Sequence, residues 1–139
     1  MPFINQKLKI NKKSILIFGV TGQDGALLAK EYLNKNFKVF GVITTRRKNF
    51  SNLKKLKIIK KIKLFRCLDI NKKRIKFLIK KSRCSIVYLL SGISSVKKSQ
   101  EYKYETILSS NLILIEILEF LRLNNLNNIK VFNASSGEI

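Results

Sequence analysis

Short apolar runs alternate with segments of helical periodicity along this chain, and this alternation constrains the fold more than any other feature. In the intervening segments the apolar positions recur three and four residues apart, as they do on one face of a helix. Alternating strands and helices of this kind predict an α/β domain with a doubly wound parallel sheet. The expected strands are 15–18, 38–44, 64–67, 85–92 and 129–136, and the expected helices are 23–34, 71–83 and 101–123.

Local signals refine the helix ends. Asn71 precedes an amphipathic run and is expected to cap that helix. Asn34 or Asn36 is expected to take the left-handed turn that ends the helix over 23–34. The stretch "LKKLKIIKKIK", residues 53–63, fits either a short basic helix or a linker, and the sequence leaves both open.

The length of 139 residues corresponds to one domain. We expect a flexible basic lead-in over residues 1–12 and a single domain over 13–139. No apolar run approaches the roughly 18–20 residues that cross a bilayer, and the N-terminus has no signal-peptide pattern. Cys67 and Cys84 have neither metal-ligand spacing nor a histidine to join them. Free thiols in a cytoplasmic protein that does not contact a membrane are therefore expected.

The net charge of +21 permits two interpretations. It could mark a polyanion such as nucleic acid as a partner. It could also reflect an AT-rich coding sequence, because lysine, isoleucine and asparagine dominate together while arginine is scarce. The lysines are scattered between apolar residues and are not interleaved with arginines and exposed aromatics, which favours the second interpretation. A nucleic-acid partner is therefore not expected, although a basic nucleic-acid-binding module stays the alternative from another class.

The stretch "ILIFGVTGQDG" joins the first expected strand to the first expected helix through Gly19, Gly22 and Gly25. In a doubly wound sheet the first such glycine permits a tight turn. The second lets the backbone approach a pyrophosphate, and the third lets the helix pack against the strand. The helix N-terminus then offers free N–H groups and a positive dipole end to the phosphates. A dinucleotide-binding site is predicted here, and a glycine-rich turn without a ligand is the alternative.

The end of the second expected strand bears on which dinucleotide binds. An acidic residue there would bind the ribose 2′-hydroxyl of NAD, whereas cations suit the 2′-phosphate of NADP. This chain has no acid in "GVITTRRKNF" and has Arg46, Arg47 and Lys48. Arginine forks match phosphate oxygens, so NADP is the expected cofactor. Plain surface charge is the alternative for both arginines.

The sequence "GVTGQDGALLAKEYL" closely resembles the opening of GDP-mannose 4,6-dehydratases, within the extended short-chain dehydrogenase/reductase superfamily. The pair Gln23 and Asp24 between the last two glycines carries most of that resemblance. It implies a Rossmann-type doubly wound parallel sheet, here truncated after about five strands, that binds NADP. The cofactor contacts implied at this turn are Gly19, Thr21, Gly22, Gln23, Asp24 and Gly25. A first-turn acid that favours the helix dipole is the plainer role for Asp24.

Two later segments extend the resemblance. "CLDI" is similar to the family's Gly-Asp-Leu segment, which implies that Asp69, beside Ile70, contacts the adenine amino group. Asp69 could equally cap the following helix. "VYLLSGISSV" is similar to the segment along which the cofactor lies, which implies cofactor contacts at Leu90, Ser91 and Gly92. The chain departs from the family at three positions, Leu89, Ile93 and Ser95, which replace Asn, Gln and His.

The last residues, "VFNASSGEI", resemble the catalytic end of the family's fifth strand. The resemblance places Ser136 at the catalytic Thr, where its hydroxyl would bond the sugar O4. It places Glu138 at the catalytic Glu, which would remove the C5 proton and then protonate the leaving C6 oxygen.

No tyrosine of this chain is followed by lysine four residues later, although the superfamily uses a Tyr-x-x-x-Lys pair. We therefore expect an N-terminal fragment that is inactive alone, from a parent that is expected to be a homo-oligomer. The parent would convert GDP-mannose to GDP-4-dehydro-6-deoxy-mannose. Another extended short-chain enzyme acting on a nucleotide sugar and a non-catalytic cofactor-binding protein remain alternatives.

Overall fold

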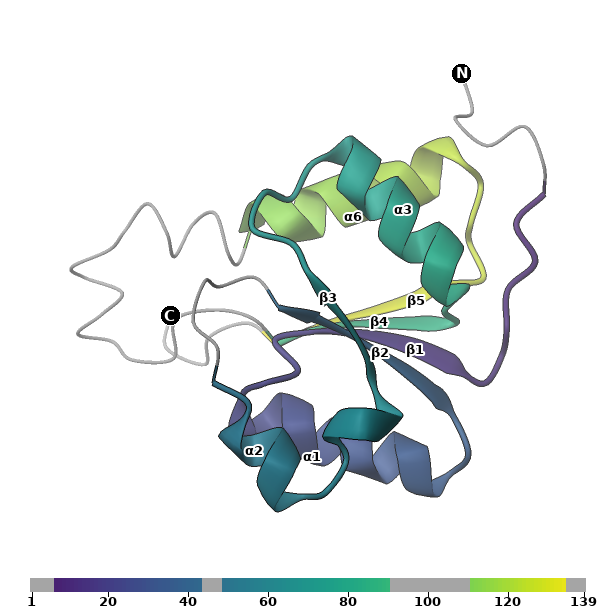
Figure 1. Ribbon diagram of the computed structural model, residues 1–139. Coiled ribbons are helices and arrows are strands. Elements are labelled where there is room, and N and C mark those ends of the chain that lie inside the picture. The colour runs from purple at the N-terminus through teal and green to yellow at the C-terminus, as the bar shows by residue number, and fades with distance from the viewer. Residues whose placement is uncertain (1–6, 44–48, 91–110, 135–139) are drawn as a thin grey trace.

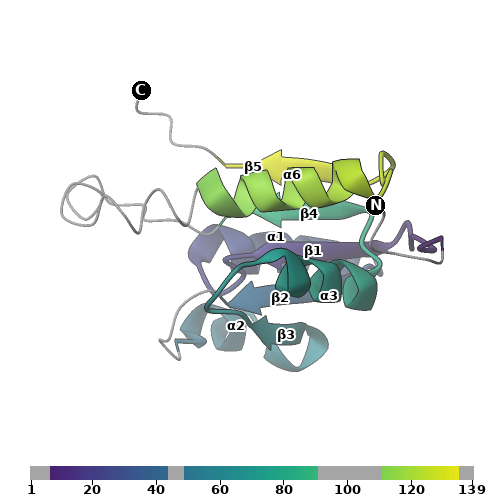
Figure 2. The same cartoon turned by 90° about the horizontal axis from the view of Figure 1, so that it is seen from above.

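A five-stranded parallel sheet forms the centre of the protein (Figure 1). The computed structural model describes residues 7–43, 49–90 and 111–134. Within them the strands lie in the order β3-β2-β1-β4-β5, and every neighbouring pair is parallel. Figure 2 shows the five strands side by side, with β3 and β5 at the two edges. The strands are β1 (Ser14–Phe18), β2 (Lys38–Ile43), β3 (Lys63–Arg66), β4 (Ile86–Leu89) and β5 (Lys130–Asn133).

Helices cover both faces of this sheet, which confirms the predicted α/β doubly wound fold. Figure 1 shows α1 and α2 below the sheet and α3 and α6 above it. The stretch that the sequence left open is part of a short helix followed by a 3-10 turn, η1 (Ile59–Lys61). The start of the long helix expected at residue 101 lies outside the described residues. The helices are α1 (Gln23–Asn34), α2 (Ser51–Lys55), α3 (Lys72–Ser82) and α6 (Ile113–Leu123).

The central strand β1 contributes side chains to an apolar core on each face of the sheet. All five of its residues are buried, as expected for a strand in the middle of a covered parallel sheet. Ile15 and Ile17 belong to the core beside α1 and α2. Leu16 and Phe18 belong to the core beside α3 and α6. Successive side chains of a strand point to opposite faces, so this single apolar run holds both layers of helices.

Asparagines define two helix ends as the sequence predicted. The side chain of Asn71 caps α3 by accepting a hydrogen bond from the backbone N–H of Arg74 at 3.0 Å. Asn36 follows α1 with a φ of 61°, the left-handed conformation that asparagine tolerates well. These contacts span few residues, which is why the local sequence predicts them.

The described part of the N-terminal lead-in packs on the domain. Leu8 and Ile10 are half-buried against the core beside α3 and α6. The backbone N–H of Asn11 donates to the Arg83 carbonyl at 2.9 Å, which ties this segment to the end of α3. Among the described residues, no helix is both long and apolar enough to cross a membrane.

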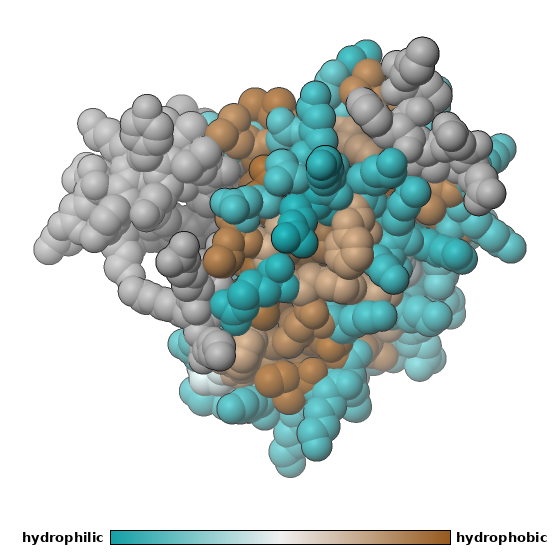
Figure 3. Space-filling view, turned by 45° about the horizontal axis from the view of Figure 1, so that its top comes forward, coloured by the Kyte–Doolittle hydropathy of each residue, from teal (hydrophilic) through white to brown (hydrophobic). Residues whose placement is uncertain are grey.

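Apolar side chains also remain on the surface. Figure 3 shows apolar surface lying open between hydrophilic side chains. On α6 and just before it, Leu112, Ile115 and Leu118 are 44%, 57% and 47% exposed. Residues three apart share a helix face, so these side chains form one stripe on the outside of the molecule.

Both cysteines are free thiols, as the sequence predicted, and the structure shows that both are buried. Burial raises the pKa of Cys84 to about 11. Burial also raises the pKa of Cys67, and the nearby charge of Arg74 opposes that shift. The reactive form of a cysteine is its thiolate, so the fold suppresses the reactivity of both.

We expect Cys84 of the native protein to resist Ellman's reagent at about pH 8, because an inaccessible thiol with a raised pKa stays protonated there. Unfolding in guanidinium chloride should release it, so that both cysteines then react. The measurement is the absorbance of the released thiolate with and without denaturant. Rapid reaction of two thiols in the folded protein would contradict the burial of Cys84.

Candidate functional site

The carboxyl ends of the strands meet at one edge of the sheet, and backbone hydrogen bonds extend the ladder into the loops there. Ligands bind at this edge in doubly wound sheets, where the strand order reverses. Here the reversal lies between β1 and β4. The extending bonds run from Gly19 N–H to Val42 O (3.1 Å), Cys67 N–H to Ile43 O (2.8 Å), Leu90 N–H to Phe18 O (2.9 Å) and Ala134 N–H to Leu89 O (3.1 Å).

Two of the three glycines in the turn after β1 are required by the fold itself. Gly19 has a φ of 83°, a conformation that side-chain-bearing residues rarely adopt. A Cβ on Gly25 would overlap the Gly19 carbonyl oxygen and lie 2.8 Å from Val20 Cα. Gly25 therefore lets the first turn of α1 pack directly on the turn that leaves β1.

Gly22 differs from both, because nothing in the described structure requires it to be glycine. Its φ of −70° and ψ of 169° are open to any residue. A Cβ there would lie 3.4 Å from the Gly19 carbonyl oxygen, an ordinary contact. The residue is exposed at the tip of the turn. A glycine at this position leaves the backbone open to close approach by a group from outside.

The N-terminus of α1 is suited to an anion. Gly22 is its N-cap and no side chain caps the helix, whereas α3 has the Asn71 cap. The first N–H groups of a helix have no partner within it and carry the positive end of the dipole. Gln23 and Asp24 are exposed in this first turn, and Thr21 before it is half-buried.

Asn52 on α2 holds the glycine turn by a hydrogen bond. This contact was not predicted from the sequence. Its side-chain Nδ2 donates to the Thr21 carbonyl at 3.0 Å. The next residue, Leu53, is fully buried in the core beside α1. The two bonded residues are 31 positions apart, and no local pattern pairs them. The one sequence signal was a polar residue at the start of a short apolar-basic stretch.

Asp69 and Ile70 follow β3 at the same edge of the sheet. Asp69 is exposed, and its carbonyl accepts a weak hydrogen bond from the Cys67 thiol at 3.5 Å. Ile70 is half-buried against the core beside α3 and α6. Because β3 lies two strands from β1, Asp69 is about 10 Å across the sheet from the glycine turn. A ligand longer than that would be needed to contact both.

Of the remaining predicted site residues, the structure describes Leu90. Leu90 is half-buried and its N–H bonds the end of β1, beside the glycine turn. Leu89, at the position where the family has Asn, is buried at 4% exposure. Residues outside the described ranges are Arg46, Arg47, Ser91, Gly92, Ser136 and Glu138.

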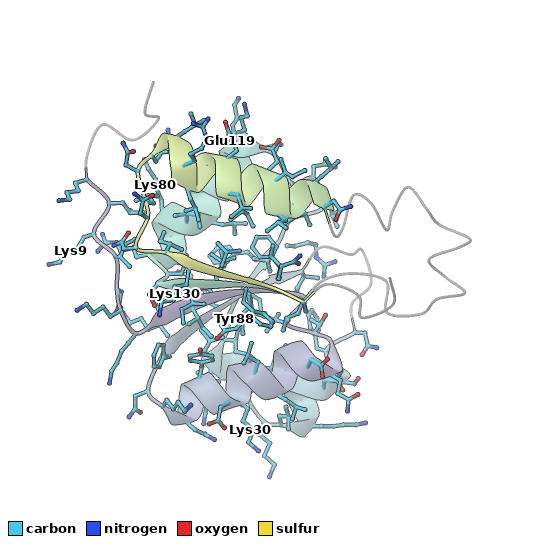
Figure 4. All side chains as sticks on the ribbon, turned by 180° about the vertical axis from the view of Figure 1, so that it is seen from behind. Lys9, Lys30, Lys80, Tyr88, Glu119 and Lys130 are labelled. Carbon is cyan, nitrogen blue, oxygen red and sulfur yellow. The ribbon has the colours of Figure 1, made fainter. Side chains whose placement is uncertain are left out.

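Tyr32 and Tyr88 form a structural pair away from this edge. Their hydroxyls hydrogen-bond each other between α1 and β4, and Figure 4 shows Tyr88 between the sheet and α1. Burial and the bond to Tyr32 raise the pKa of Tyr88 to about 12. A phenol that holds its proton this firmly is a poor general base near neutral pH.

Comparison with known proteins identifies the family of this chain. The family model for GDP-mannose 4,6 dehydratase matches residues 16–139, which include most of β1, the glycine turn and the four strands that follow. The chain belongs to the GDP-mannose 4,6-dehydratase family. No match was found among curated proteins.

Solved structures with the same fold include UDP-glucose 4-epimerases. UDP-glucose 4-epimerase from Stenotrophomonas maltophila, solved with NAD and formylated UDP-arabinopyranose, is 16% identical with a TM-score of 0.66, over 81% of this chain and 34% of its own. An epimerase from Methanothermobacter thermautotrophicus is 19% identical with a TM-score of 0.68, over 87% of this chain and 33% of its own. UDP-glucose 4-epimerase from Thermus thermophilus, solved with NAD, is 18% identical with a TM-score of 0.65, over 80% and 34%.

At these identities the similarity establishes the fold. The chain matches about a third of the length of each of these structures.

The glycine turn makes a prediction about stability. Gly25→Ala should lower the free energy of unfolding by about 3 kcal/mol, because the new methyl group overlaps backbone atoms that cannot move aside. Gly22→Ala should change it by less than about 1 kcal/mol, because its backbone angles suit alanine. Urea denaturation followed by circular dichroism measures both. Equal losses in the two variants would show that the turn is not packed as described.

Proposed function

We propose that the chain forms the dinucleotide-binding part of a nucleotide-sugar 4,6-dehydratase that uses NADP. The proposal depends on the geometry of Gly22. The fold does not require glycine at this position, whereas a pyrophosphate that approaches the uncapped N-terminus of α1 would require it. Family membership supports the dehydratase assignment, and the epimerases of the same fold solved with NAD support a nicotinamide dinucleotide as the ligand.

The proposed arrangement follows the edge of the sheet. The N–H groups at the start of α1, over Gly22–Asp24, would bind the pyrophosphate. Asp69 would accept a hydrogen bond from the adenine amino group, with Ile70 beside the ring. The separation of about 10 Å between these positions suits the two halves of an adenosine diphosphate unit. On the other side of β1, the backbone of Leu90–Gly92 would line the path toward the nicotinamide.

The chemistry assigned to the end of β5 rests on the family resemblance. When bound, NADP would supply the acceptor for a hydride from C4 of the sugar and the donor that returns it at C6. The O4 proton would pass to the tyrosine of the superfamily's Tyr-x-x-x-Lys pair, which the 139 residues do not contain. The Ser136 hydroxyl would hydrogen-bond the sugar O4. The Glu138 carboxylate would accept the C5 proton and then deliver a proton to the departing C6 oxygen, so that water is eliminated. GDP-mannose is the proposed substrate.

A second candidate is an epimerase or another extended short-chain enzyme acting on a nucleotide sugar. The solved structures favour it, since UDP-glucose 4-epimerases share the fold. One of them, from Thermotoga maritima, was solved with UDP-glucose. Both candidates use the same cofactor edge, and the departures at Leu89, Ile93 and Ser95 fall where the family resemblance is weakest.

Gly22→Ala tests the proposed phosphate contact. We expect it to fold as the wild type does and to bind NADPH at least about tenfold more weakly, because its methyl group would occupy the space of the pyrophosphate. Fluorescence titration of NADPH measures the dissociation constant. Unchanged affinity in the folded variant would remove the observation on which the proposal depends.

Selectivity between dinucleotides tests the role of Arg46 and Arg47. The wild type should bind NADPH more tightly than NADH, and the double variant Arg46→Ala/Arg47→Ala should lose that preference by about tenfold or more, because the guanidinium groups would hold the 2′-phosphate. Lys54→Ala/Lys55→Ala removes the same charge from exposed positions on α2 and should leave the preference intact. An arginine variant that keeps the wild-type preference for NADPH would contradict the role of the two arginines. A wild type that binds NADH as tightly as NADPH would argue for NAD.

A further inference from the structure

Lysines that the sequence scatters are gathered by the fold at the end of the sheet opposite the glycine turn. Exposed lysines flank the starts of the strands, and we call six of them, on β2, β5, α3 and the segment that precedes β1, the amino-edge surface. Figure 4 shows three of them, Lys9, Lys80 and Lys130, at the same end of the molecule. The six members are Lys9, Lys12, Lys13, Lys38, Lys80 and Lys130.

Backbone hydrogen bonds fix most of these lysines relative to one another. The Lys38 N–H donates to the Lys13 carbonyl at 2.8 Å. The Ser85 hydroxyl donates to the Lys12 carbonyl at 3.0 Å, and the Lys130 N–H donates to the Ser85 carbonyl at 3.0 Å. Because neighbouring strands are about 4.8 Å apart, the lysine backbones stand in a row with fixed spacing.

The charge of this row is not balanced within the described part of the chain. The two ion pairs there join Lys35 to Glu31 and Arg122 to Glu119, and neither includes a member of the amino-edge surface. Asp24 and Asp69 lie at the opposite edge of the sheet, as described above. Uncompensated ammonium groups in a row repel one another, and an anionic partner would relieve that repulsion.

A shallow hollow lies within the amino-edge surface. It measures about 400 Å³, and its lining includes Lys9, Lys12, Ser85 and Asn128. Lys7 lines it as well, so the hollow combines three ammonium groups with a hydroxyl and an amide, all of which can bond phosphate oxygens. A neighbouring hollow of about 380 Å³ is lined by the asparagine-rich turn over 124–128. Leu8 and Ile10 also line the first hollow, so its polar groups stand around apolar side chains.

The remaining observations decide between kinds of polyanion. The large exposed apolar side chains of the described residues are Leu27, Leu68, Phe77, Leu112, Ile115, Leu118 and Phe132. None of them belongs to the segments that lead into the strands. Binding in a bilayer interface needs apolar side chains that insert, so a membrane surface is disfavoured as the partner. The same absence disfavours stacking on unpaired bases. A duplex, which presents regularly spaced phosphates, fits the row best.

We propose that the amino-edge surface binds the phosphate backbone of double-stranded nucleic acid without sequence preference. This interaction goes beyond the proposed dinucleotide site and uses the other end of the sheet, so each can be lost without the other. Lysine contacts to phosphate position a protein and read no base sequence.

The test is fluorescence anisotropy of a labelled DNA duplex of arbitrary sequence, titrated with the full 139-residue chain at several salt concentrations. Six phosphate contacts predict that log Kobs falls against log salt concentration with a slope of about −5. The variant Lys9→Gln/Lys80→Gln/Lys130→Gln should bind at least about tenfold more weakly and reduce the magnitude of that slope by about 3.

The matched control is Lys30→Gln/Lys54→Gln/Lys55→Gln, which removes the same charge from exposed positions on α1 and α2. It should keep the wild-type slope. Equal losses in the two triple variants would mean that binding follows net charge alone, which would overturn the proposal. Wild-type binding to phosphatidylserine vesicles with no binding to the duplex would overturn it as well. NADPH affinity, measured in parallel, should be the same in the amino-edge variant and the wild type.

Discussion

The close approach of α1 to the turn that leaves β1 is the contact on which the rest of the structure depends. It is possible because Gly25 has no side chain to meet the Gly19 carbonyl. The approach sets the position of the helix N-terminus at the edge of the sheet. Asn52 then bonds the same turn, and Leu53 buries beside α1, so the position of α2 follows from that of α1.

The sequence predicted those parts of the fold whose cause is local. The run over β1 is apolar at every position but its first, and such a run suits a strand covered on both faces. Asn71 contacts a residue three positions away. By contrast, Asn52 bonds a partner 31 positions away, and Leu8 packs on a core made by elements near the other end of the chain. Periodicity and capping patterns contain no information about such pairs.

The candidate site shows the same division. Gly19 and Gly25 were predicted from their spacing, and the structure gives each the role that the spacing indicated. The sequence could not show how Gly22 differs from Gly19 and Gly25. Only the interatomic distances around Gly22 show that the fold has room for a side chain there. The roles of Arg46, Arg47, Ser136 and Glu138 stay predictions from the cofactor argument and the family resemblance.

The position of β1 in the middle of the sheet has a consequence for folding. Although β1 comes first along the chain, it pairs with both β2 and β4. Its register with β4 joins Ile15 to Ile86, so a long loop must close before that side of β1 is covered. Non-local pairing of this kind slows folding, because loop-closure entropy is lost before the contact is gained. As the chain leaves the ribosome, the most apolar strand therefore stays half-paired until β4 has followed it.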